Sequence, residues 1–146
     1  MTRRIDTELS IAASPERVWS VLTDFAAYPQ WNPFIESIEG EPEPGTRLTV
    51  RIRAGDARHV FKPVVLQATA CRRLRWLGRV GVAGLFDGEH DFELRAEQGG
   101  TRFLQSESFQ GFLVPFLWRR VEPATRAGFE AMNRALKARV ESRSAG

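Results

Sequence analysis

The sequence predicts an α+β protein in which a curved antiparallel sheet of about seven strands wraps around a long C-terminal helix, with short helices after the first strand. Two observations carry this prediction. Short runs of strand composition follow one another with turn residues between them, which is typical of an antiparallel meander. The last third of the chain then changes to a helical period with one apolar stripe. These elements bury their apolar faces only if the sheet curves around the helix.

The first elements are a strand and a short helix. Residues 5–11, IDTELSI, alternate apolar and polar side chains imperfectly, and Ser14 and Pro15 then provide an N-cap and a first helical residue. The loop DFAAYPQWNPF, residues 24–34, follows at once. It carries four aromatic side chains: Phe25, Tyr28, Trp31 and Phe34.

Six further segments have strand composition: IESIEG, TRLTVRIRA, RHVFKPVVLQATA, RLRWLGRV, FDGEHDFELRA and TRFLQSESFQG. The closing helix is expected to cover at least residues 126–140. Its stripe comprises Val121, Thr125, Gly128, Phe129, Met132, Leu136 and Val140. Pro123 lies inside this pattern and predicts either a kink or a helix start nearby.

Length and composition set the class of protein. With 146 residues, 42% of them hydrophobic, we expect a single domain over 1–146. A net charge of +3 is too small to indicate a nucleic-acid partner. Cys71 alone forms no intrachain disulfide, the N-terminus lacks a signal-peptide pattern, and no apolar run is long enough to span a membrane. We expect a cytoplasmic monomer or homodimer.

The turn EQGG fixes a register between the last two predicted strands. That register places three pairs on one face: Leu94 with Phe103, Phe92 with Gln105, and His90 with Glu107. Because this face is the more apolar one, it is assigned to the interior. His90 and Glu107 are therefore predicted to be buried neighbours.

The turn AGDA gives a second set of pairs: Ile52 with His59, Val50 with Phe61 and Leu48 with Pro63. Extension to a turn at Cys71 and Arg72 pairs Gln67 with Trp76 and Thr69 with Leu74. This phase points His59 and Gln67 inward. It leaves Val64 and Leu66 outward, which indicates a bulge or a buried outer surface.

Four stretches resemble the START-like (SRPBCC) superfamily of polyketide cyclases and dehydrases, whose fold is called helix-grip. They are SPERVWSVLTDFAAYPQWNPF, GLFDGEHDFEL, ESFQGFLVPF and GFEAMNRALKARVE, and together they span nearly the whole chain. The resemblance implies a cavity between the sheet and the C-terminal helix. It names no ligand, because this fold hosts many functions.

An inner face that mixes aromatic rings with imidazole, carboxylate and amide groups is unusual for a core, because buried polar groups need partners or water. A ligand cavity explains the mixture. The residues expected to contact a ligand are Tyr28, Trp31, Val50, His59, Phe61, Gln67, Trp76, Phe92, Phe103, Gln105, Phe109, Phe129 and Met132. Two interpretations of the aromatic loop stay open: a wall of the cavity, or an ordinary plug of the core.

Three functions are compatible with these features. The first is binding of an apolar small molecule such as a lipid, polyketide or aromatic metabolite. The second is a cyclase, aromatase or dehydratase in which His90, polarised by Glu107, moves a proton; the same pair also fits a satisfied internal contact without chemistry. The third is a protein-interaction module, co-chaperone-like or antitoxin-like, that uses outward arginines: Arg51, Arg53, Arg73 and Arg75. No cofactor is expected, and two separated histidines with one cysteine do not form a metal-ligand pattern.

Overall fold

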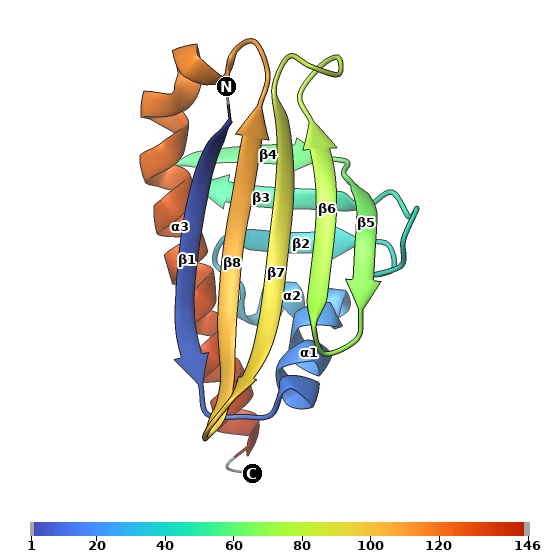
Figure 1. Ribbon diagram of the computed structural model, residues 1–146, viewed down its shortest axis with the longest axis vertical. Coiled ribbons are helices and arrows are strands. Elements are labelled where there is room, and N and C mark those ends of the chain that lie inside the picture. The colour runs from blue at the N-terminus through green and yellow to red at the C-terminus, as the bar shows by residue number, and fades with distance from the viewer. Residues whose placement is uncertain (1, 145–146) are drawn as a thin grey trace.

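The computed structural model describes residues 2–144, which form eight strands arranged in two antiparallel sheets and four helical segments (Figure 1). The strands are β1 (Arg3–Ile11), β2 (Ile35–Glu39), β3 (Thr49–Ala54), β4 (Ala57–Phe61), β5 (Val64–Thr69), β6 (Arg73–Arg79), β7 (Asp87–Glu97) and β8 (Gly100–Gln110). The helices are α1 (Pro15–Thr23), the 3₁₀ turn η1 (Phe25–Ala27), α2 (Tyr28–Trp31) and α3 (Val114–Ser144).

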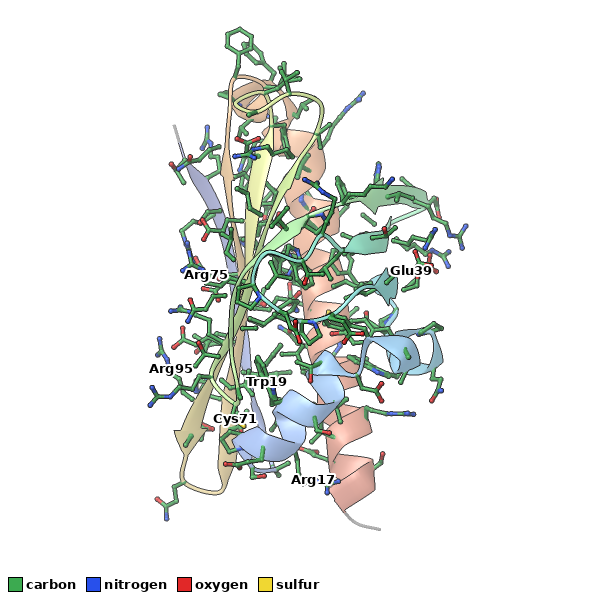
Figure 2. The ribbon with its side chains drawn as sticks, turned by 90° about the vertical axis from the view of Figure 1, so that its right-hand side faces the viewer. Arg17, Trp19, Glu39, Cys71, Arg75 and Arg95 are labelled. Atoms are coloured by element: carbon green, nitrogen blue, oxygen red, sulfur yellow. The ribbon has the colours of Figure 1, made fainter. Side chains whose placement is uncertain are left out.

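The strands grip α3, as the sequence predicts, but they form two sheets where one curved sheet was expected. The larger sheet has the order β1-β8-β7-β6-β5 and the smaller one the order β2-β3-β4. Figure 1 shows the smaller sheet crossing behind the larger one, and Figure 2, turned by 90°, shows α3 running lengthwise beside both. Within residues 2–144, no helix has the length and apolar character needed to cross a membrane.

The segment expected as one long strand is divided at Lys62 and Pro63, which accounts for eight strands instead of about seven. Proline lacks a backbone N–H and cannot continue a strand ladder on that side. Its carbonyl still accepts from the Leu48 amide at 2.8 Å. The chain therefore passes at this point from the smaller sheet into the larger one.

The predicted helix signals are confirmed. The Ser14 side chain accepts from the Arg17 amide at 3.3 Å, and Pro15 begins α1. The last helix covers the expected residues 126–140 and continues through Pro123. Its buried stripe, Phe129, Met132, Leu136 and Val140, is fully enclosed.

The register predicted across the turn EQGG is also confirmed, with His90 opposite Glu107 and Phe92 opposite Gln105. The register predicted across the turn AGDA holds as well, since Val50 lies opposite Phe61. Regular short turns make these registers readable, because an even number of loop residues preserves the alternation of faces.

The predicted register between β5 and β6 is wrong. It paired Gln67 with Trp76, whereas the structure pairs Gln67 with Arg75. The connection contains three residues, 70–72, instead of two, and Cys71 adopts a left-handed φ of 65° within it. An odd loop shifts the pairing by one residue and exchanges the two faces.

A bulge between Val65 and Gln67 then places the Val65 side chain on the buried face of β5. The outward positions of Val64 and Leu66 in the predicted phase indicated such a bulge, and Leu66 is indeed exposed while Val65 is buried. Gln67 consequently points outward, not inward, and its amide donates to the Thr69 hydroxyl at 3.0 Å.

Candidate functional site

His90 and Glu107 lie side by side on the inner face of the larger sheet, on β7 and β8. Imidazole Nδ1 is 3.4 Å from carboxylate Oε1. The His90 side chain is 3% exposed and that of Glu107 is 18% exposed. The predicted neighbour relation is therefore confirmed, and Glu107 is the member of the pair that solvent reaches.

A buried hydrogen-bonded relay leads away from the other nitrogen of His90. Nε2 lies 2.9 Å from Gln105 Oε1, and Gln105 Nε2 donates to Asn133 Oδ1 at 2.7 Å. Asn133 Nδ2 in turn donates to Thr7 Oγ1 at 2.8 Å, and the Thr7 hydroxyl donates to the Gln105 carbonyl at 2.8 Å. The relay thus connects β7, β8, α3 and β1 through the core.

The last acceptor of the relay, the Gln105 carbonyl oxygen, fixes which group donates in every other hydrogen bond of the relay. A carbonyl oxygen only accepts, so the single hydroxyl proton of Thr7 is used on it and its oxygen must accept from Asn133. Asn133 therefore presents its NH₂ to Thr7 and its oxygen to Gln105. Gln105 then presents its oxygen to His90, so Nε2 of His90 carries a proton.

This tautomer determines what lies between His90 and Glu107. With the Nε2 proton committed to the relay, a neutral imidazole directs the lone pair of Nδ1 at the carboxylate. A hydrogen bond across this contact would use one further proton, held on Nδ1 or on the carboxyl group. His90 and Glu107 therefore form an imidazole–carboxylate pair inside the protein.

Three aromatic rings enclose the imidazole. Its centroid lies 4.5 Å from Phe92, 4.9 Å from Phe129 and 5.2 Å from Trp76. All three rings belong to residues predicted to contact a ligand. They exclude water from His90 and leave the side facing Glu107 as its polar opening.

A glycine provides the space that the carboxylate occupies. A Cβ built on Gly88 would lie 2.2 Å from Glu107 Oε2, far inside van der Waals contact. Gly78 lies directly beside Gly88 on β6, so the inner face carries two adjacent residues without side chains at this point. Glu107 rests over this thin part of the sheet.

Most of the other predicted ligand residues are packed in the core: Val50, Phe103, Gln105, Phe109 and Met132 are buried. Tyr28 is also buried, and its hydroxyl donates to the Leu22 carbonyl at 2.5 Å. Burial, with a smaller contribution from the charge of Asp24, raises the pKa of Tyr28. Trp31 is half-buried against Tyr28, and its indole N–H lacks an acceptor among the described residues.

His59 does not lie in the interior, which corrects the prediction that it points inward. It shares a face with Phe61, at a centroid distance of 6.0 Å, so the predicted alternation along the strand is right. However, β4 is an edge strand of the smaller sheet and extends beyond the core. His59 is consequently exposed and Phe61 only half-buried.

Two open hollows, of about 600 and 480 Å³, lie on the outside of the molecule. The larger is bounded by the start of α1 and the β5–β6 connection, and the smaller by charged residues on the outer face of the larger sheet. Neither of these two hollows is lined by His90, by Glu107 or by a residue of α3.

The outward arginines are mostly engaged with acids. Arg73 binds both Asp91 and Glu93, and Arg75 binds Glu89. Figure 2 shows Arg75 and Arg95 on the side of the larger sheet that faces away from α3. This paired surface offers few free charges to a protein partner.

Sequence reasoning missed two members of the relay, although both carried a signal. Asn133 follows Phe129 by four residues and precedes Leu136 by three, which places it on the buried stripe. Thr7 alternates with Ile5 on the inner side of β1. Within residues 2–144, no three His, Cys, Asp or Glu side chains come together in a way that could hold a metal ion.

The architecture, antiparallel sheet that grips a long C-terminal helix, is that of the START-like helix-grip proteins. The chain belongs to the polyketide cyclase/dehydrase and lipid transport family, whose model matches residues 2–141. No curated protein sequence gives a significant match.

Solved structures with the same fold include the Zhui aromatase/cyclase from Streptomyces sp. R1128, with a TM-score of 0.80 at 18% identity over 99% of this chain and 96% of that one. A START superfamily protein from Mycobacterium smegmatis gives a TM-score of 0.74 at 24% identity over 95% and 97% of the two chains. The di-domain ARO/CYC StfQ from the steffimycin biosynthetic pathway gives a TM-score of 0.81 at 12% identity over 100% of this chain. This chain spans 53% of the length of StfQ. At these identities the likeness concerns the fold.

Proposed function

We propose that this protein binds an apolar small molecule between the larger sheet and α3, and that the Glu107–His90 pair anchors a polar group of that molecule. The observation that carries the proposal is the imidazole–carboxylate pair of His90 and Glu107, with aromatic rings around the imidazole. A ligand with one hydroxyl or carbonyl group on an apolar body matches both features. Family membership supports the same class of function.

The residues predicted to contact the ligand fall into two groups under this proposal. Trp76, Phe92 and Phe129 surround His90 and would contact the part of the ligand next to the polar anchor. Phe109, which lies opposite Gly88, would contact the part over the two glycines. His59 and Gln67 are too far toward the surface to belong to either group.

Binding is tested with an environment-sensitive apolar fluorophore and with native mass spectrometry of freshly purified protein. Glu107→Gln keeps the shape of the side chain but removes the ionisable group, and it should weaken binding of a hydroxyl-bearing or carbonyl-bearing probe by about tenfold. Glu89→Gln on the outer face is the matched control and should bind normally. Equal affinities in Glu107→Gln and the wild type would reject the anchor.

A second function, acid/base catalysis on a bound carbonyl compound, is favoured by the contact between imidazole and carboxylate. Nε2 of His90 is engaged by Gln105, and Nδ1 faces the Glu107 carboxylate at 3.4 Å. Glu107 would therefore be the group that exchanges a proton with substrate, and His90 would position and recharge it. This reverses the roles expected from the sequence.

Exchange of the α-hydrogens of a β-keto thioester in D₂O, followed by NMR, tests this second function. The reaction needs only removal and return of a proton beside a carbonyl group. Exchange that is faster with wild type than with Glu107→Gln, and unchanged in Glu89→Gln, supports it. Binding without any acceleration leaves the protein a binding protein.

A further inference from the structure

One end of the molecule presents a cluster of exposed apolar side chains, which we call the apolar tip. It is formed by the β6–β7 connection, residues 80–86, and the β8–α3 connection with the first turn of α3, residues 111–116. These segments lie at the same end of the molecule, at the top of Figure 1. Of the six large apolar side chains that are exposed in the described part of the chain, four belong to the tip: Val80, Val82, Phe112 and Phe116.

The two phenylalanines dominate the tip. Phe112 is 73% exposed and Phe116 is 74% exposed, and their ring centroids lie 6.1 Å apart. Most large apolar side chains in this protein are buried, so two adjacent exposed rings require an explanation in terms of a partner.

Backbone hydrogen bonds hold the two connections of the tip together. The Phe112 amide donates to the Gly84 carbonyl at 3.0 Å, and the Leu113 amide donates to the Leu85 carbonyl at 3.0 Å. A Cβ built on Gly111 would lie 2.4 Å from the Leu85 oxygen, so the close approach depends on glycine. The rings therefore project from a fixed base.

Positive charge lies next to these rings. Arg119 and Arg120 follow Phe116 by three and four residues, which places them on the same side of α3. Both are exposed, and neither forms an ion pair among the described residues. Arg79, at the end of β6, is also exposed, and its Nε lies 3.7 Å from Oδ1 of Asp87, the first residue of β7.

We propose that the apolar tip docks on the surface of a bilayer that contains anionic lipids. Phe112 and Phe116 enter the boundary between headgroups and acyl chains, and Arg119 and Arg120 bind lipid phosphates. Exposed apolar rings bordered by free guanidinium groups are the combination that such a surface binds. A stable protein interface instead buries about 800 Å² per partner around a well-packed core, so binding to a protein partner is the alternative that the vesicle experiment separates.

Vesicle sedimentation tests this inference independently of any interior ligand. The wild type should sediment with vesicles of phosphatidylcholine and phosphatidylserine, bind weakly to phosphatidylcholine alone, and dissociate as salt is raised. Phe112→Ser/Phe116→Ser should lower partitioning at least about tenfold, and Arg119→Gln/Arg120→Gln should lower it by about tenfold or more on anionic vesicles only.

Val60→Ser/Leu66→Ser is the matched control, because it removes two exposed apolar side chains far from the tip on β4 and β5. It should bind vesicles like the wild type. All the substituted side chains are exposed, so circular dichroism should show unchanged folding. Failure of the wild type to bind anionic vesicles, or an equal loss in the Val60/Leu66 control, would overturn the proposal.

Discussion

Removal of Gln105 from the buried relay provides a quantitative test of its connectivity. Gln105→Leu leaves two buried polar groups without partners, the Nε2–H of His90 and the Oδ1 of Asn133. Each such group costs about 1–3 kcal/mol, so the free energy of unfolding should fall by about 2–6 kcal/mol. Asn133→Leu mainly orphans one amide donor of Gln105 and should cost about 1–3 kcal/mol.

The double variant Gln105→Leu/Asn133→Leu gives the decisive comparison. It leaves one orphaned group, the His90 Nε2–H, because the other two polar side chains have been removed together. It should therefore be more stable than Gln105→Leu alone, with a coupling free energy of at least about 1 kcal/mol. Urea unfolding followed by circular dichroism measures all three variants against the wild type.

Thr101→Val is the control for this cycle. Thr101 is buried on the same strand and donates to the Ala13 carbonyl at 2.7 Å, outside the relay. Its loss should cost about 1 kcal/mol and should add to that of Gln105→Leu within about 0.5 kcal/mol. If the stability losses of Gln105→Leu and Asn133→Leu also add within about 0.5 kcal/mol, the four side chains do not form a connected relay. The tautomer assigned to His90 then loses its basis.

Three further predictions concern single contacts. Gly128→Ala places a Cβ 2.2 Å from the Phe34 ring, and this overpacking should lower the free energy of unfolding by about 1–3 kcal/mol and with it the urea midpoint. An unchanged midpoint would contradict close packing of the ring on α3. Gly88→Ala should displace the Glu107 carboxylate and change the NMR chemical shifts of the His90 ring beside it, whereas unchanged shifts would place the carboxylate elsewhere. Burial raises the pKa of Tyr28 above its ordinary value of 10.0, so the unfolded state loses this proton first and wild-type stability should fall as the pH rises above about 10. Tyr28→Phe should reduce that fall between about pH 9 and about pH 11, and an identical fall in both proteins would refute the contribution.

The sequence predicts this fold well where the turns are regular. The even loop around Gly99 fixed the β7–β8 register and hence the contact between His90 and Glu107. The three-residue length of the connection at Cys71 could not be predicted, because nothing in the amino-acid composition indicates a left-handed φ at a non-glycine residue. The error in one loop then reversed the face assigned to Gln67.

The candidate site was predicted only in part. Alternation along strands identifies which side chains face inward, but it does not show how far an edge strand extends past the core, which is why His59 was misplaced. Alternation along the strands also cannot predict the hydrogen bonds of the relay, since Asn133 reaches Gln105 from a helix distant in sequence. Only three-dimensional packing brings those two amides together.

A column of aromatic rings connects the His90–Glu107 pair with the apolar tip. Phe109 lies opposite Gly88, beside Glu107, and its ring packs 5.8 Å from Phe86 and 5.4 Å from Trp118. Phe86 ends the β6–β7 connection, and Trp118 lies in the helix turn after Phe116.

On the proposed docking, a lipid-like molecule that leaves the bilayer at the tip meets these rings on its way to Glu107. Anionic vesicles should then speed entry of an apolar probe into the wild type but not into Phe112→Ser/Phe116→Ser. Equal entry rates in the two proteins would show that the probe does not enter through the tip. The tip would then serve for docking alone, and the route to Glu107 would lie elsewhere.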